Sequence, residues 1–198
     1  ASTSEVYGDV AIGKNPILET EPFAPVNPYA ISKCTQEHIA GYYSKANGIP
    51  LVILRAFGYI NPKRDDLVAT AYGKQIIAIE RGAQPSELRH GNLAPLRSFC
   101  DARDIADAYW RAATMCQPGV YNVGSEAGLS IHALLTTMSA ATKAEFSWLP
   151  VAELMRRTDI YFCVPNARKF IEATGWGMNF PLEESVDWLL NELRGVNV

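Results

Sequence analysis

Hydrophobic and polar positions alternate along the chain in blocks that predict helices followed by short buried strands. Residues 30–46 carry apolar side chains at helical spacing, with Pro28 suited to the first turn and Gly48 and Pro50 to the end of the helix. Residues 51–56 form a short aliphatic run, typical of a strand buried on both faces. A helix followed closely by such a strand indicates a parallel α/β sheet.

The same pattern predicts the remaining elements. Further helices are expected over residues 66–81, 102–115, 130–141, 166–174 and 181–194, and short strands at 120–123, at 145–149 and near Leu88. The expected helix caps are Asp101, Ser130 and Asn166, and the expected helix ends are Gly82 and Gly175. The last helix is amphipathic, with its apolar side chains facing inward: Leu182, Val186, Leu189, Leu190 and Leu193. Residues 58–64 and most of 83–97 are expected to be loop.

The composition is that of an ordinary globular protein, with 48% hydrophobic and 20% charged residues among 198. The net charge of −3 and the lack of a basic run argue against nucleic acid as a partner. No apolar stretch approaches the roughly 20 residues that cross a bilayer, and no secretory signal opens the chain. The cysteines form no Cys-x-x-Cys pair and the histidines show no ligand spacing, so we expect free thiols in a cytoplasmic protein and no metal site.

The opening residues, Ala1 to Gly8, have the pattern of a buried strand end and the turn that follows it. Hydroxyl groups and a carboxylate at such a strand end can face a ligand. A strand end this polar normally has several elements before it. We therefore expect the chain to be a truncated part of a larger fold.

Tyr29 and Lys33 are four residues apart in the first predicted helix, so they share one helical face. An ammonium close to a phenol favours the phenolate, which suits proton transfer. The Tyr-x-x-x-Lys spacing alone is a weak signal because it recurs by chance in many helices.

The segments around this pair make the signal stronger. Ser2-Thr3-Ser4-Glu5-Val6-Tyr7-Gly8 comes first, Asn27-Pro28 directly precedes Tyr29, and the strand that ends in Arg55-Ala56 follows. In this order and spacing the chain resembles the extended short-chain dehydrogenases, which include nucleotide-sugar epimerases, dehydratases and reductases. The resemblance extends over nearly the whole chain.

Later segments resemble one branch of that family, the GDP-4-keto-6-deoxy-mannose reductases, which are relatives of GDP-mannose 4,6-dehydratase. These segments are residues 64–68, Lys74-Gln75-Ile76, Gly91-Asn92-Leu93, Arg97-Ser98-Phe99 with Asp104, residues 119–125, and Thr174-Gly175-Trp176 with residues 181–184. Residues 91–93 and 119–125 are shared across the wider family, whereas Arg64-Asp65-Asp66 and Lys74-Gln75-Ile76 favour the reductases. The resemblance implies an α/β fold in which residues 1–56 and 100–123 are the later part of a Rossmann cofactor domain, a doubly wound parallel sheet. Residues 57–99 and 124–198 would then form a small α/β substrate-binding lobe.

The resemblance also implies NADPH-dependent reduction of a GDP-4-keto-6-deoxy sugar, with NADP(H) or NAD(H) as cofactor and a homodimer as the assembly. Thr3 would bond the sugar carbonyl oxygen, Tyr29 would exchange its proton, and Lys33 would bind the nicotinamide ribose. Glu5 aligns with the base of the dehydratases, and Phe57 is expected beside the cofactor. The residues expected to bind the nucleotide-diphosphate sugar are Ser4, Lys74, Arg97 and Arg156, three of them cations suited to a diphosphate.

Simpler roles compete with these. Thr3 and Ser4 could satisfy backbone groups at a turn, Glu5 could be structural, and Arg97 and Arg156 could form surface ion pairs. Arg55 is expected in a strand-end salt bridge and not at a ligand. Three aromatic side chains are expected in core packing and not in base stacking: Phe99, Tyr109 and Trp110.

Three departures from the family pattern leave other functions open. The Gly-x-x-Gly-x-x-Gly turn that holds a dinucleotide pyrophosphate is absent from the sequence. Gly58 stands where the family usually has Asn, and Ser98 where an Asp commonly follows the arginine. A GDP-mannose 4,6-dehydratase, a sugar 4-epimerase and a non-catalytic fragment that keeps the substrate-side fold therefore remain alternatives.

Overall fold

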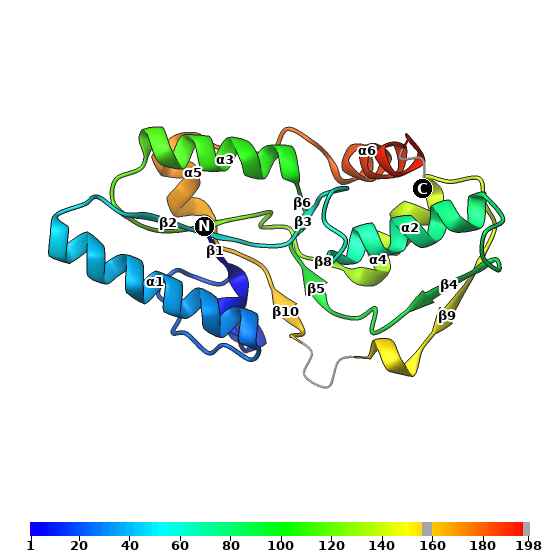
Figure 1. Ribbon diagram of the computed structural model, residues 1–198, viewed down its shortest axis with the longest axis horizontal. Helices are drawn as coiled ribbons and strands as arrows, with labels where there is room; N and C mark the ends of the chain where they lie inside the picture. Colours follow the sequence, from blue (N-terminus) through cyan, green and yellow to red (C-terminus); the bar gives the residue numbers. More distant parts are fainter. Residues whose placement is uncertain (156–159, 196–198) are drawn as a thin grey trace.

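The computed structural model describes residues 1–155 and 160–195 (Figure 1). Its central sheet has three parallel strands in the order β1 (Ser2–Thr3), β2 (Val52–Ala56) and β7 (Gly119–Val123). Since all three run in the same direction, the loops that follow them leave the sheet at one edge, where α/β proteins bind their ligands. The predicted α/β class and the strands at 51–56 and 120–123 are confirmed.

Helices cover both faces of this sheet. Figure 1 shows α1 (Pro28–Asn47) on one side, and α3 (Ala102–Met115) and α5 (Arg168–Thr174) on the other. Pro28 lies in the first turn of α1 and Gly48 closes the helix with a φ of 64°, both as predicted. The helix starts two residues earlier than predicted, because Asn27 Oδ1 accepts from the Ala30 amide at 2.8 Å and caps it.

A second group of helices lies at the other end of the molecule, beside a two-stranded parallel ribbon (Figure 1). The helices are α2 (Val68–Glu80), α4 (Ile131–Ala140) and α6 (Leu182–Gly195), and the ribbon strands are β4 (Glu87–His90) and β9 (Ser147–Pro150). Their apolar faces form one core cluster. The inward face predicted for the last helix is confirmed, since Val186, Leu189, Leu190 and Leu193 are buried and Leu182 packs against the cluster.

Short elements join the two groups. Strand β3 (Tyr59–Ile60) pairs with β6 (Cys100–Asp101), and β5 (Leu96–Arg97) lies between β10 (Phe162–Cys163) and β8 (Leu129–Ser130). Single 3₁₀ turns cover Ser4–Tyr7, Ile12–Lys14 and Ala152–Leu154. The prediction of continuous loop over 58–64 was wrong, because a two-residue strand is decided by its distant partner and leaves no local pattern.

Two predicted helix starts were also displaced. The first residue of α5 is Arg168 and its cap is Ala167, although the Asn166 side chain accepts from the Arg168 amide at 3.1 Å. Helix α2 starts at Val68, later than predicted, because Asp66 is engaged with the Arg64 guanidinium in the preceding turn.

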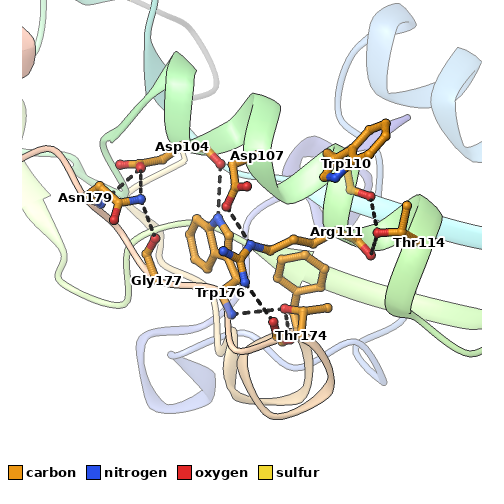
Figure 2. Close-up of polar contacts among 10 residues, drawn as sticks. Asp104, Asp107, Trp110, Arg111, Thr114, Thr174, Trp176, Gly177 and Asn179 are labelled. Carbon is orange, nitrogen blue, oxygen red and sulfur yellow. Dashed lines mark hydrogen bonds and ion pairs between the residues drawn. The ribbon is translucent and has the colours of Figure 1, made fainter.

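The segment between α5 and α6 is fastened to α3 (Figure 2). The buried Asp104 carboxylate accepts from the Asn179 amide at 3.0 Å and from the Phe180 amide at 3.3 Å. The Trp176 indole donates to the Asp104 carbonyl, and Arg111 donates to the Thr174 carbonyl. These bonds bring residues 174–180 onto the helix that covers the central sheet.

That packing bears on the predicted domain limits. Phe170 and Trp176 belong to the same buried cluster as Leu54 and Val123 of the central sheet, although the predicted division assigned residues 124–198 to the substrate-binding lobe. The division into two domains stays a prediction.

The core packing predicted for Phe99 and Tyr109 is confirmed, in two separate clusters, whereas that predicted for Trp110 was wrong. Phe99 is buried among the α2, α4 and α6 side chains, whereas Tyr109 packs with the central sheet. Trp110 is 70% exposed, and Figure 2 shows its ring directed away from the Arg111 and Trp176 contacts. Trp110 follows Tyr109 directly on α3, so the helical turn of about 100° per residue directs the two side chains differently.

Candidate active site

The end of β1 and the turn that follows it carry three of the predicted site residues. Thr3 and Ser4 are less than 10% exposed, and Thr3 Oγ1 accepts from the Glu5 amide at 3.3 Å. Glu5 Oε2 accepts from Asn27 Nδ2 at 2.6 Å. Since Asn27 also caps α1, this bond ties the loop to the start of the helix that carries Tyr29. The competing backbone role of Thr3 is therefore present, and its catalytic role stays a prediction.

Tyr29 and Lys33 lie on one face of α1, as their spacing predicts. The Lys33 ammonium is 5.9 Å from the centre of the Tyr29 ring, and Tyr29 is 49% exposed. Lys33 Nζ donates to the Ala1 carbonyl at 3.3 Å and to Gln36 Oε1 at 2.9 Å. The phenol and the ammonium are thus open to solvent, and Lys33 reaches from α1 to the start of β1.

A buried polar network lies beneath these groups. Arg55 donates from Nε and Nη2 to the two Glu37 carboxylate oxygens, at 2.9 and 2.8 Å, and from Nη1 to the Tyr7 hydroxyl at 2.9 Å. Burial raises the pKa of Tyr7 to about 12, and its hydroxyl donates to Asn122 at 2.7 Å. Burial opposes the Arg55 charge, yet its bonds to Glu37 and Tyr7 keep its pKa above the usual value. The predicted salt bridge of Arg55 is confirmed.

Arg97 lies opposite Cys163 in the β5–β10 pair. Burial raises the pKa of the Cys163 thiol, which also interacts with the Ser4 hydroxyl and with the charges of Arg97 and Glu5. Arg97 Nη1 donates to the Leu96 carbonyl at 3.0 Å. The β5–β10 pairing therefore places Arg97 opposite Cys163, whose thiol interacts with Ser4 in the segment after β1.

Comparison with known proteins shows to which family this chain belongs. A family model described as GDP-mannose 4,6 dehydratase matches residues 1–188. The chain belongs to this family. A GDP-6-deoxy-D-mannose reductase of Pseudomonas aeruginosa is 28% identical over 193 residues, and a UDP-glucose 4-epimerase of Streptococcus mutans is 27% identical over 197 residues. The matches cover 96% and 91% of this chain but 64% and 58% of the two relatives, so the chain spans less than two thirds of their length.

Solved structures of relatives share the fold. The structure of RMD from Pseudomonas aeruginosa complexed with NADPH matches 98% of this chain and 65% of that chain, with a TM-score of 0.91 and 28% identity. A Thermus thermophilus UDP-glucose 4-epimerase in complex with NAD has a TM-score of 0.83 at 24% identity, a likeness of fold alone. The predicted Rossmann-type α/β fold is confirmed.

Three of the predicted ligand-binding residues are not open to a ligand in this structure or lie outside the described residues. The Lys74 ammonium on α2 is half exposed and is paired with Asp65 at 2.8 Å, so a substrate phosphate would have to displace that carboxylate. The Phe57 ring is 1% exposed and packs near Tyr7, with 6.2 Å between ring centres, so its side chain presents little surface to a cofactor. Arg156 lies outside the described residues. All three assignments stay predictions.

The two departures from the family pattern at Gly58 and Ser98 lie against each other. A Cβ atom at Gly58 would come within 2.3 Å of the Ser98 carbonyl oxygen, which is too close for any side chain on this backbone. The Ser98 hydroxyl accepts from the Ser125 amide at 2.8 Å and is fully buried. Gly58 is therefore required by the close approach of two backbone segments.

Three residues around the pair were not among the predicted site residues. Asn27 joins Glu5 to α1, and Glu37 follows Lys33 by four residues on the same helical face, a spacing that the sequence does contain. Arg64 donates to the Tyr59 hydroxyl at 3.3 Å and to both Asp66 oxygens. Its bonds to Asp66, and the phenols of Tyr59 and Tyr29, raise its pKa. No sequence signal predicted the contact of Arg64 with Tyr59.

Within 1–155 and 160–195, no three His, Cys, Asp or Glu side chains gather as a metal site. No helix in that part of the chain combines the length and the apolar character needed to span a membrane.

Proposed function

We propose that this chain provides the acid/base and substrate-binding part of an NADPH-dependent reductase of a GDP-4-keto-6-deoxy sugar. The observation that carries this proposal is the exposed Tyr29–Lys33 pair at the start of α1, joined through Asn27 to the loop with Thr3 and Glu5. The 28% identity to a GDP-6-deoxy-D-mannose reductase supports the choice of reaction within the family.

Each group has a chemical role in this proposal. The Thr3 hydroxyl would donate to the 4-keto oxygen, and Tyr29 would give that oxygen a proton as it becomes an alcohol. The Lys33 ammonium donates to the Ala1 carbonyl and to Gln36, which leaves its third N–H for a ribose hydroxyl of NADP(H) or NAD(H). The nicotinamide, when bound, supplies hydride to C4 of the sugar. A cofactor contact at Phe57 fits only through its main chain, because its ring is buried.

On the substrate side, Cys163 pairs with Arg97 across β5 and β10 and its thiol interacts with Ser4, which supports a common site for the two residues. We propose that Arg97 binds the nucleotide diphosphate together with Arg156 and, after release from Asp65, Lys74. Guanidinium groups suit this task because they donate two parallel hydrogen bonds to phosphate oxygens.

Turnover tests the proposal directly. The purified chain is mixed with NADPH and a GDP-4-keto-6-deoxy sugar, and NADPH oxidation and sugar product are followed together. We expect one NADPH consumed per sugar reduced, and a loss of about 10²–10⁴-fold in rate on Tyr29→Phe. Tyr42→Phe is the matched control, since Tyr42 is a 67% exposed tyrosine on the same helix. Absence of NADPH oxidation by the wild-type chain would contradict the proposal.

The same assay separates the alternatives. Water loss from GDP-mannose without net NADPH consumption, abolished by Glu5→Gln, would indicate a dehydratase. Inversion at C4 without net oxidation would indicate an epimerase. Binding of GDP-sugar without turnover would indicate a non-catalytic fragment.

We also propose that the protein is a cytoplasmic homodimer whose subunits meet along α1. Four large apolar side chains on one side of this helix are more than half exposed: Ile31, Ile39, Tyr42 and Tyr43. An unpartnered apolar stripe of this kind favours association with a second copy. Sedimentation should show a dimer that Ile39→Glu dissociates, whereas a monomeric parent chain would refute the assembly.

A further inference from the structure

One buried ion pair contacts both segments that carry the candidate catalytic groups. The two side chains of this pair, Glu37 and Arg55, are joined by hydrogen bonds of 2.8 and 2.9 Å and are less than 10% exposed. Glu37 belongs to α1 and Arg55 to β2, so the pair connects the helix of Tyr29 and Lys33 to the middle strand of the sheet.

The same pair holds the loop after β1 at two points. The Ser2 hydroxyl donates to Glu37 Oε1, directly before the loop. Arg55 Nη1 donates to the Tyr7 hydroxyl at 2.9 Å, at the end of the loop. Residues 3–5 therefore lie between two anchors on one ion pair.

Through α1, Glu37 is also linked to the candidate catalytic residues. Glu37 follows Lys33, and Lys33 follows Tyr29, at intervals of four residues, so the three side chains lie along one face of α1. Any rotation of the helix that displaced Glu37 would displace Tyr29 and Lys33 with it. The Arg55 guanidinium cannot follow freely, because it is stacked within 5 Å of the ring centres of Tyr7 and Phe23.

We propose that Glu37 and Arg55 are positioning residues that hold Thr3 and Tyr29 at their mutual distance. Being buried, they act through Ser2, Tyr7 and the helix and do not touch a substrate. A bidentate guanidinium–carboxylate pair fixes orientation as well as distance. The inference rests on the proposed function only in treating Thr3 and Tyr29 as reacting groups.

The test compares two double variants with the wild-type chain. Glu37→Gln/Arg55→Gln removes both charges together, so no buried charge is left alone. The matched control is Asp101→Asn/Arg103→Gln, which removes another bidentate pair with a fully buried carboxylate, at the start of α3. Hydrogen exchange of residues 2–7 and 29–33 is measured by mass spectrometry at a temperature where all three proteins are folded.

We expect amide exchange in both segments to accelerate by about tenfold in Glu37→Gln/Arg55→Gln and to stay unchanged in the control pair. In the turnover assay, kcat should fall by about 10²-fold with KM within about threefold, since a displacement of roughly 1 Å at reacting groups has that effect. The control variant should keep its kcat within about threefold, since the Arg103 guanidinium packs against Phe180 and Trp188 instead of the two candidate segments.

Unchanged exchange in both segments of the first double variant would overturn the proposal, as would an equal loss of kcat in both double variants. If Glu37→Gln/Arg55→Gln does not fold, Ser2→Ala takes its place, because it loosens one anchor and leaves the ion pair intact. Faster exchange of residues 2–7 in Ser2→Ala then supports the proposal, and unchanged exchange overturns it. A wild-type chain without turnover refutes the proposed function, and the exchange comparison alone then decides the positioning role.

Discussion

Two buried carboxylates, Glu37 and Asp104, are stabilised in different ways in two regions of the molecule. Glu37 is 8% exposed and its charge is matched by the Arg55 guanidinium. Asp104 is 1% exposed and is held by N–H donors of Asn179 and Phe180, in the first turn of α3 (Figure 2). A helix N-terminus favours a negative charge there without a side-chain cation.

The two kinds of hydrogen-bond partner correspond to two kinds of connection between elements. Asp104 receives backbone amides, so it docks one continuous segment, residues 177–180, onto α3. Glu37 is bonded by side chains from β1 and β2, so it fixes elements that are distant in sequence. When one partner of a buried ion pair is removed, the other is left as an unpaired buried charge, which costs much unfolding free energy. When a carboxylate held by amides is removed, only neutral N–H groups lose a partner, and the cost is smaller. The predictions below test that distinction.

The largest effect is expected for Glu37→Gln. The variant leaves the Arg55 guanidinium buried without its counter-charge, and breaking a buried pair on one side costs about 3–5 kcal/mol of unfolding free energy. Urea denaturation measures the change. A loss below about 1 kcal/mol, the value of an exposed pair, would show that the network relaxes to solvent.

A smaller effect is expected for Asp104→Asn. The amide keeps the size of the side chain but replaces one acceptor by a donor, so an N–H group of residues 179–180 loses its partner, at about 1–3 kcal/mol. Urea denaturation of this variant beside Glu37→Gln gives the comparison. Equal losses in the two variants would mean that the charge of Arg55 adds nothing.

The pH dependence of stability distinguishes the two regions further. The pKa of Tyr7 is raised to about 12 by burial, from an ordinary value of about 10. The stabilisation from its neutral phenol is complete below about pH 10 and is lost as the pH rises through about 12. The unfolding free energy of wild type should therefore fall more steeply between pH 10 and 12 than that of Tyr7→Phe. Asp104→Asn should keep the wild-type slope, and identical slopes in wild type and Tyr7→Phe would contradict the assignment.

The smallest effect is expected for Asp107→Ala, in the same region as Asp104. Asp107 accepts from Arg111 at 2.7 Å, but both side chains are about one third exposed and the pair is four residues apart on α3. Such pairs contribute about 0.3–0.5 kcal/mol. Thermal denaturation in low and high salt measures the difference, which salt should reduce; a loss as large as that of Asp104→Asn would remove the contrast between exposed and buried carboxylates.

The sequence by itself determined the helices with strong periodicity and clear ends, as at Asp101, Ser130 and Gly48. It also determined the shared face of Tyr29 and Lys33, because four residues are close to one helical turn. Local chemistry suffices for these features, since the interacting groups are neighbours along the chain.

Only the tertiary structure decided which distant groups meet. The bond between Asn27 and Glu5, the network of Glu37 with Ser2 and Arg55, and the approach of Gly58 to Ser98 depend on the order of strands in the sheet. The two-residue strands and the exposure of Trp110 depend on it too. Pairing between segments far apart in sequence leaves no periodic mark on either one, so the placement of the candidate site follows from packing and not from local pattern.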